Sequence, residues 1–245
     1  MKLSAIIPTG NEEHNIVNAI KSVDFADEII IVDSFSKDNT IELATKLADT
    51  ILQREYINSA SQKNWAIPQA KFEWIFLIDA DERVPLDLKE EILEVLSSEN
   101  NFSGFWIKRQ NYFMGKKIHF SGWRGDKVIR LFKRDKCKYE EKNVHAEIIS
   151  EGKIGMLKNK LIHNTFTSKE AYIDKLRRYA RWQAEGIDYL NLEWQMKTPH
   201  TEKSKKNQDM YTGIHYQYSS DNEVDYLSFS STDNDEINSR LNWVA

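Results

Sequence analysis

The sequence predicts an α/β protein whose mixed, mainly parallel sheet is flanked by helices. Short apolar runs alternate with helical patterns over residues 1–100, which is typical of repeated β-α-β units. Residues 74–78 are apolar without interruption, as in a parallel strand that is buried on both faces. Residues 79–82 then bring three carboxylates to the end of that strand, where open α/β sheets bind ligands.

The composition is that of an ordinary globular protein and excludes several classes. Of the 245 residues, 40% are hydrophobic and 29% are charged, which allows one large domain or one domain with an appendage. The net charge of −4 gives no general attraction to nucleic acid, and the single cysteine, Cys137, excludes an internal disulfide and a cysteine-based zinc site. We expect neither a signal peptide nor a transmembrane helix, and therefore a cytoplasmic location.

The elements of the first half follow from the spacing of apolar residues. Helices carry such residues three or four positions apart, as Ile16, Ile20 and Val23 do, whereas the strands are short continuous runs. Pro68 is expected to end or kink its helix. The expected strands are 3–7, 28–32, 50–53 and 74–78, and the expected helices are 12–23, 40–48, 60–70 and 88–96.

The pattern changes after residue 101. Strands are expected at 102–108 and 127–133, with weaker candidates at 147–149 and 157–162, and we expect this half to be mixed or antiparallel and to pack on the sheet. A capping box at residues 167–170 opens a helix that continues to about residue 194. The polar remainder is expected to be poorly ordered or loosely docked.

The acidic segment at 79–82 has the chemistry of a cation site. Asp79 and Asp81 are two residues apart, so on a continuing strand they share one face. Two carboxylates on one face suit Mg²⁺ or Mn²⁺, which also bind phosphate oxygens. An isolated Asp-x-Asp is more often an acidic turn that binds nothing, because this tripeptide pattern is common by chance. Three further polar segments follow the other strands or precede the acidic one, and all map to one sheet edge: 8–13, 33–40 and 62–64.

In this order and spacing, these segments resemble the family 2 inverting glycosyltransferases, which use nucleotide-diphosphate sugars on a GT-A fold. The matching motifs are PTGNEE at 8–13, VDSFSKDNT at 32–40, KN at 63–64 and the DXD-type DADE at 79–82. A further set resembles the branch that adds glucose in β-1,4 linkage to the lipopolysaccharide inner core: NYFMG at 111–115, GW at 122–123, Asp126, RLF at 130–132 and VH at 144–145. The resemblance extends over about residues 3–185.

The sequence departs from that pattern in three places. Gly10 stands where an aromatic residue often stacks on the base, so stacking must come from elsewhere. His145-Ala146-Glu147 replaces an adjacent His-Glu pair, which puts the role of Glu147 in doubt. The polar tail replaces a hydrophobic or basic segment that commonly holds such enzymes at the membrane.

The resemblance also implies roles for individual residues. It places the metal on Asp81, with Asp79 near the metal or the ribose, and it places Asp33 on the edge of the uracil ring. The nucleotide-binding residues that it implies are Thr9, Asn11, Glu12, Asp33, Lys63 and Asp79.

Inversion requires one carboxylate to accept the proton of the acceptor hydroxyl. Asp126 is the first candidate, and Glu147 is the second. An ion pair between Asp126 and Arg124 or Arg130 is an equally weighted alternative. Residues 108–142 are rich in cations, which would match an acidic acceptor. The acceptor-binding residues expected here are Trp123, Arg124, Lys127, Arg130 and His145.

These inferences predict a metal-dependent inverting transferase that moves a hexose, expected to be glucose, from a UDP-sugar to a lipopolysaccharide core or other surface glycan. The expected cofactor is Mg²⁺ or Mn²⁺, and the expected partners are the UDP-sugar and an acidic glycolipid or oligosaccharide, with no nucleic acid. Peripheral contact with the cytoplasmic face of the inner membrane is a further expectation. We expect a transferase domain at 1–165, with a nucleotide half at 1–100 and an acceptor half at 101–165, and a C-terminal extension at 166–245.

Two alternatives differ in class. The first is an inactive transferase fold that serves as a binding partner. The second is a metal-dependent phosphatase of the haloacid dehalogenase type, which also places Asp-x-Asp after a strand. That class usually has Thr or Val where Arg83 stands, and it carries the motif on its first strand.

Overall fold

The computed structural model describes residues 1–118, 125–141 and 146–166, six positions between 168 and 177, and the backbone of 214–218 and 224–229. The chain divides into two compact units, Met1–Trp182 and Gln183–Ala245. In the described part of the second unit, β12 (Ile214–Tyr218) pairs antiparallel with β13 (Val224–Phe229). Only this hairpin of the tail is described, and the expectation of a poorly ordered or loosely docked tail stays a prediction.

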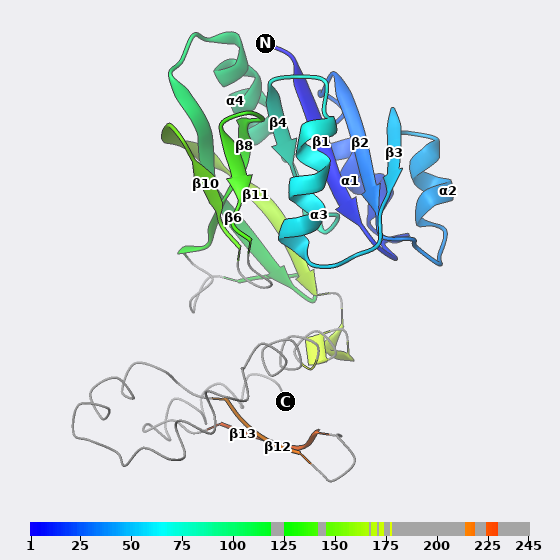
Figure 1. Ribbon diagram of the computed structural model, residues 1–245. Helices are drawn as coiled ribbons and strands as arrows, with labels where there is room; N and C mark the ends of the chain where they lie inside the picture. Colours follow the sequence, from blue (N-terminus) through cyan, green and yellow to red (C-terminus); the bar gives the residue numbers. More distant parts are fainter. Residues whose placement is uncertain are drawn as a thin grey trace, which may run out of the picture. The chain divides into compact units, whose positions relative to one another are not determined.

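The first half of unit 1 is a parallel β-α-β succession (Figure 1). Its strands lie in the order β3-β2-β1-β4. The elements are β1 (Leu3–Thr9), α1 (Ile16–Ser22), β2 (Glu28–Asp33), α2 (Thr40–Thr45), β3 (Thr50–Gln53), α3 (Ser59–Ala66), the 3₁₀ turn η1 (Ile67–Gln69), β4 (Trp74–Leu77), β5 (Glu82–Arg83) and α4 (Leu86–Ser97). Pro68 lies in η1, so the helix ends where proline was expected to end it.

The second half extends the same sheet rather than packing on it. Strand β8 pairs antiparallel with β4 and with β6, and β6 pairs parallel with β11, so a mixed sheet of nine described strands results. The elements are β6 (Phe102–Phe113), β7 (Lys116–Lys117), β8 (Lys127–Lys133), β9 (Cys137–Tyr139), β10 (Ile148–Ser150) and β11 (Lys153–Phe166). This mixed α/β architecture confirms the expected fold class.

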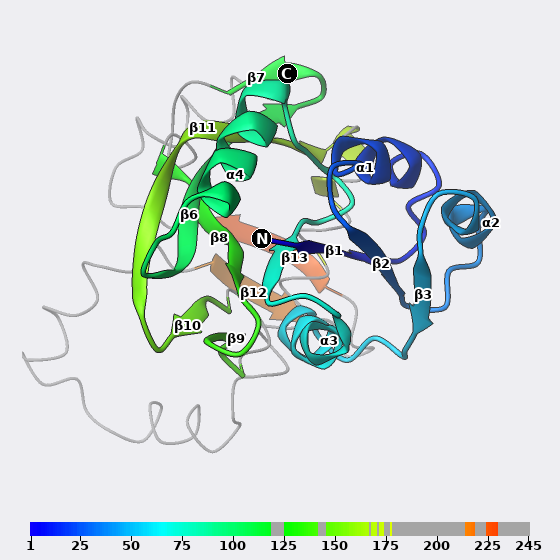
Figure 2. The same cartoon turned by 90° about the horizontal axis from the view of Figure 1, so that it is seen from above.

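The period-2 alternation of the central strands builds a core on each face of the sheet. Leu3, Ala5 and Ile7 of β1 pack in one core with the apolar residues of α1, α2 and α4, whereas Ile6 packs in the other with α3. Figure 2 shows α1 and α2 on one side of the sheet and α3 on the other. Both faces are therefore covered, which explains why β4 is apolar at every position.

Strand directions determine where the polar ends meet. Because β8 is antiparallel to both β4 and β6, strands β1, β2, β4, β6 and β11 all run the same way. The carboxyl ends of these strands therefore lie at one edge of the sheet, together with the beginning of β8. None of the helices in the described parts of the chain is long and apolar enough to cross a membrane.

Candidate active site

A cleft of about 1120 Å³ opens along this edge. Its lining comes from the loop after β1, the acidic segment after β4, the start of β8 and the ends of β6 and β11. The sequence motifs at 8–13, 62–64 and 79–82 all contribute residues to it. The lining residues used below are Thr9, Tyr56, Gln62, Lys63, Asp79, Asp81, Arg109, Asn111, Asp126, Lys127, Glu147 and His163.

Asp79 is held by two cations. Lys63 Nζ lies 2.8 Å from Asp79 Oδ1, and Arg130 Nη2 contacts Asp79 Oδ2. Burial would raise the pKa of the Asp79 carboxyl, but the charges of Arg130 and Lys63 outweigh burial and hold that pKa well below 3.8. Asp79 is therefore ionised, and both of its oxygens are already engaged.

A chain of alternating charges continues from Asp79 beneath the cleft. Arg130, which is 3% exposed, also contacts Glu82 at 2.7 Å, and Arg109 lies 3.4 Å from the same Glu82 carboxylate. Arg109 then binds Asp126 through two hydrogen bonds, of 2.8 Å from Nε and 3.0 Å from Nη2. The chain fixes Asp79 and Asp126 relative to each other through rigid guanidinium forks.

Asn111 connects Asp126 to a histidine that the sequence analysis did not identify. Its Nδ2 donates to Asp126 Oδ2 at 3.0 Å, and its Oδ1 lies 2.6 Å from His163 Nδ1. Since an amide oxygen only accepts, His163 carries a proton on Nδ1. Its Nε2 lies 3.5 Å from Asp81 Oδ2. In the neutral ring Nε2 would hold the lone pair, and Nε2 and Asp81 Oδ2 would then be close enough to share a cation.

Buried polar atoms without a hydrogen-bond partner cluster at this cleft. Among the described residues, these atoms are Thr9 Oγ1, Gln62 Oε1, Asp81 Oδ1 and Arg130 Nε. Three of them belong to residues that line the cleft. Buried polar groups are nearly always paired in folded proteins, so this clustering indicates a polar ligand that supplies the missing partners.

The other expected nucleotide-binding residues lie at the edge of the cleft or below it. Asn11 adopts a positive φ of 55°, and Asn11 and Glu12 both line the cleft. Asp33 is fully buried beneath it, where its carboxylate accepts hydrogen bonds from Ser36 and Gln53. In this structure Asp33 therefore positions the loop after β2 rather than presenting its carboxylate to the cleft.

Of the residues expected to act on the acceptor, some line the cleft and one lies beneath it. Asp126, Glu147 and Lys127 line the cleft, whereas Arg130 lies beneath it and contacts Asp79 instead. Among the described residues, Asp126 pairs with Arg109 and not with Arg130. Burial would raise the pKa of the Asp126 carboxyl, but the hydrogen bonds and charge of Arg109 lower it below 3.8. Trp123, Arg124 and His145 lie outside the described residues.

Four residues at the site were given no role of their own by the sequence analysis: Tyr56, Arg109, Asn111 and His163. Asn111 entered only as the start of the NYFMG motif, and Arg109 only as part of the basic segment 108–142. His163 and Asn111 are register partners on the parallel strands β11 and β6. The expected strands ended at 108 and 162, one to a few residues too early to place either side chain at the sheet edge. Tyr56, which is 44% exposed, offers the cleft an aromatic ring that Gly10 cannot provide.

Comparison with known proteins establishes the family. The family model for glycosyl transferase family 2 matches residues 4–152, which is more than half of the chain. The chain belongs to this family. The match confirms the resemblance drawn from the motifs, and it excludes the alternative that the chain is a phosphatase of the haloacid dehalogenase type.

Family 2 relatives match over most of the chain. The lipopolysaccharide core biosynthesis glycosyltransferase LpsC of Rhizobium meliloti is 31% identical over 192 residues, which are 76% of this chain and 71% of that protein. An uncharacterized glycosyltransferase of Rickettsia conorii is 30% identical over 198 residues, covering 76% of this chain and 70% of the relative. A solved structure of S. aureus TarS in complex with UDP is similar, with a TM-score of 0.49 and 16% identity. The match covers 71% of this chain and 63% of the TarS chain.

The side chains at the cleft fit a divalent cation better at Asp81 than at Asp79. Within the described residues there is no group of three or more His, Cys, Asp or Glu that could hold a metal by themselves. Asp81 has a buried oxygen without a partner, and its other oxygen lies 3.5 Å from His163 Nε2. Two protein ligands leave positions for phosphate oxygens and water, which is how Mg²⁺ is usually bound.

Proposed function

We propose that this family 2 glycosyltransferase moves a hexose, expected to be glucose, with inversion from a UDP-sugar to an acidic acceptor of the lipopolysaccharide core type. The observation that carries the proposal is the Asp81–His163 pair, whose Oδ2 and Nε2 atoms lie 3.5 Å apart beside a cluster of buried polar atoms that lack hydrogen-bond partners. The similarity to the R. meliloti core enzyme supports the acceptor class.

In this proposal the floor of the cleft binds the nucleotide. Thr9 Oγ1 and Gln62 Oε1 are buried and lack partners, so they are available to a ligand. Lys63, Asn11, Glu12 and Asp79 complete the nucleotide side, with Lys63 held in place by Asp79. Tyr56 supplies the stacking surface for the base. Asp33 acts from below by holding Ser36, so its contribution is to position the loop.

The leaving diphosphate needs positive charge at the point where its own charge develops. Asp81 and His163 would hold Mg²⁺ or Mn²⁺, which supplies that charge as a Lewis acid. Asn111 keeps the His163 proton on Nδ1, so that Nε2 remains a ligand. Asp79 is already neutralised by two cations, so we assign it to orienting Lys63 and the nucleotide.

Asp126 remains our first candidate for the base. Arg109 and Asn111 hold its carboxylate in place at the cleft, and its lowered pKa keeps it ionised. A lowered pKa also makes it a weak base, which keeps the exposed Glu147 as the alternative. Lys127, on the same loop, would contact the acceptor. The acceptor-binding roles of Trp123, Arg124 and His145 stay predictions. The cytoplasmic location, the membrane contact and the domain boundary at residue 165 also stay predictions.

Thermal unfolding with and without ligand tests the nucleotide and the metal together. A ligand that binds only the folded state raises its stability. We expect UDP with Mn²⁺ to raise the melting temperature, and UDP without metal to raise it much less. His163→Ala should remove most of the metal-dependent part, whereas His14→Ala, a change at an exposed histidine outside the cleft, should not. Equal stabilisation with and without metal would contradict the metal-bridged site.

A further inference from the structure

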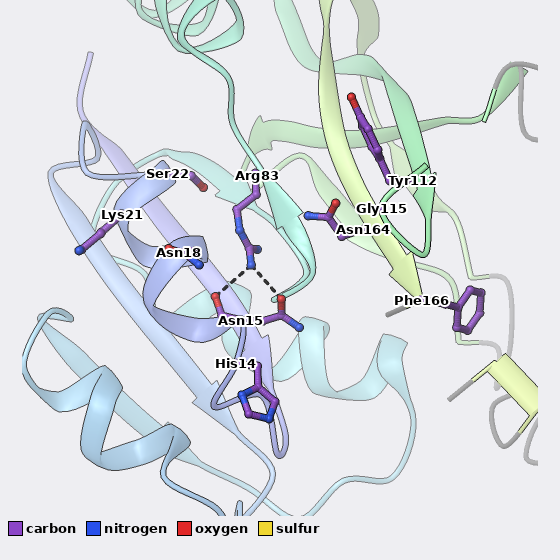
Figure 3. A pocket seen from close by; sticks show the side chains of 10 residues that line it. All are labelled: His14, Asn15, Asn18, Lys21, Ser22, Arg83, Tyr112, Gly115, Asn164 and Phe166. Atoms are coloured by element: carbon purple, nitrogen blue, oxygen red, sulfur yellow. Dashed lines mark hydrogen bonds between the residues drawn. The ribbon is translucent and has the colours of Figure 1, made fainter. Parts of the chain in front are cut away.

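A second pocket of about 750 Å³ adjoins the cleft; we call it the side pocket. It lies between α1, β5, the β6–β7 turn and the end of β11 (Figure 3). Phe166 lines both the side pocket and the cleft, so the two hollows are neighbours. Nothing in the proposed reaction uses the side pocket.

The lining of the side pocket is cationic and amide-rich. Lys21, Arg83 and His14 bring basic groups, and none of its ten lining residues is Asp or Glu. The cleft differs, because its lining combines basic groups with five carboxylate side chains: Glu12, Asp79, Asp81, Asp126 and Glu147. A hollow with basic groups and no carboxylate has the electrostatics of an anion site.

Arg83 makes the charge of the side pocket unusual. Its guanidinium donates to the backbone oxygens of Ala80 and Glu82, each at 2.6 Å, and to Asn15 O and Oδ1 at 3.1 and 2.9 Å (Figure 3). All four partners are neutral, and the described residues give Arg83 no ion pair within 4.0 Å. Burial lowers the pKa of this guanidinium, yet arginine stays protonated in proteins. The charges of Asp81 and Glu12 oppose this lowering from a distance. The positive charge of Arg83 is thus partly desolvated, and no carboxylate of the described residues lies within ion-pair distance of it.

The remaining side chains suit a sugar. The amides of Asn18 and Asn164 offer donors and acceptors for hydroxyl groups, whereas the Asn15 amide is engaged by Glu12 and Arg83. Tyr112 and Phe166 offer ring surfaces. The side pocket is also tied to the reaction centre. Asn164 N donates to Asp81 O at 2.9 Å, and Arg83 follows Asp81 by two residues on the same loop.

We infer that the side pocket binds the phosphate or carboxylate group of an anionic sugar unit, presented by the acceptor whose reacting hydroxyl lies in the cleft. That the bound sugar belongs to an acceptor rests on the proposed function. That the side pocket binds an anion depends only on the residues that line it. The acceptor's charge is then recognised beside α1, in addition to the basic segment at 108–142.

Nuclear magnetic resonance of the full chain tests this inference directly, because the side-chain amides of Asn18 and Asn164 report from inside the pocket. The probes are glucose 6-phosphate, inorganic phosphate and glucose, each titrated without nucleotide and with UDP and Mg²⁺ present. Lys21→Glu and Asn18→Asp bring negative charge to exposed lining positions, and Lys153→Glu is the matched control on an exposed lysine outside both hollows.

We expect glucose 6-phosphate to shift the Asn18 and Asn164 signals, and each lining variant to weaken its binding by about tenfold or more through charge repulsion. The control should bind as the parent does, and glucose should bind much more weakly. Unmoved amide signals, or unchanged binding in Lys21→Glu, would overturn the anion site. If inorganic phosphate binds as tightly as glucose 6-phosphate, the pocket does not recognise the sugar part of the ligand. If UDP fails to bind while these shifts persist, the proposed function falls and the side pocket stands.

Discussion

At the scale of single residues, the buried amide of Asn111 links the two halves of the proposed chemistry. It is 2% exposed, and it donates to Asp126 while accepting from His163. The amide group cannot turn over without breaking both contacts, because its oxygen accepts from His163 and its nitrogen donates to Asp126. Asn111 therefore fixes both the tautomer of His163 and the position of the candidate base.

We predict that Asn111→Ala weakens Mn²⁺ binding, in the presence of UDP, by about 10- to 100-fold, as loss of a group that orients a metal ligand typically does. Titration calorimetry measures the affinity. Gln110→Ala on the same strand is the control, since its amide donates to the backbone oxygens of Asn111 and Ile118 and to no side chain of the site. Unchanged metal affinity in Asn111→Ala would show that the amide only fills space.

Asp126 yields a prediction with two readouts. Asp126→Asn should collapse kcat with little change in UDP-sugar binding, because it removes the proton acceptor and keeps the shape. If Asp126→Asn stays active while Glu147→Gln is inactive, the base is Glu147.

The second readout is the stability of the same variant against pH. Arg109 and Asn111 depress the folded-state pKa of Asp126 below 3.8, so its contribution to stability is present above the unfolded pKa and is lost as pH falls through the folded pKa. The parent should therefore lose more unfolding free energy between about pH 5 and pH 2 than Asp126→Asn does. Parallel urea-unfolding curves would mean that the Arg109 ion pair has no net effect.

At the scale of elements, the pairing of β6 with β11 brings Asn111 and His163 together. Gly155 allows this pairing, because a Cβ at that position would lie 2.6 Å from the ring of Phe105, which is 5% exposed. We predict that Gly155→Ala lowers the free energy of unfolding by about 1–3 kcal/mol through overpacking. Gly125→Ala, whose Cβ would meet nothing within 4 Å, is the control in chemical denaturation. An unchanged midpoint for Gly155→Ala would show that Phe105 moves freely.

The sequence predicted the elements whose patterns are local. Strands β1 to β4 and their helices were placed correctly because each is a short apolar run or an amphipathic repeat. The helix expected at 12–23 begins later, at Ile16, because Asn11 takes a left-handed conformation and residues 12–15 form a turn. Strand β11 runs to Phe166, whereas the expected strand ended at 162. Its last residues are held in the sheet by pairing with β6 and β5, and a hydrophobic pattern does not reveal such pairing.

The same reasoning explains what was predicted at the site. Asp79, Asp81, Lys63 and Thr9 follow or precede strands with clear patterns, so the sequence placed them at one edge. Arg130 and Asp33 were identified as site residues, but a sequence pattern does not reveal that each lies beneath the cleft. The partnership of Asp81 with His163 spans 82 positions and depends on β11 lying parallel to β6. Such non-local pairings leave no spacing signal.

At the scale of the whole molecule, one edge of the sheet carries two neighbouring hollows that differ in their charged groups. The cleft carries carboxylates for a cation and a nucleotide, and the side pocket carries cations for an anion. An inactive transferase fold would bind the nucleotide without turnover, so binding alone does not separate it from an enzyme. Turnover with a defined stereochemical outcome does.

The most direct measurement is therefore the early time course of UDP-glucose cleavage by the full chain, followed by proton magnetic resonance of the released sugar. An inverting enzyme converts the α-linked donor first to β-glucose when water replaces the acceptor. We predict β-glucose as the initial product, formed with Mn²⁺ or Mg²⁺, absent with a chelator and absent in Asp81→Ala, whose unfolding remains cooperative. Initial release of α-glucose, turnover that persists without metal, or no cleavage by a metal-loaded protein that binds UDP would contradict the account.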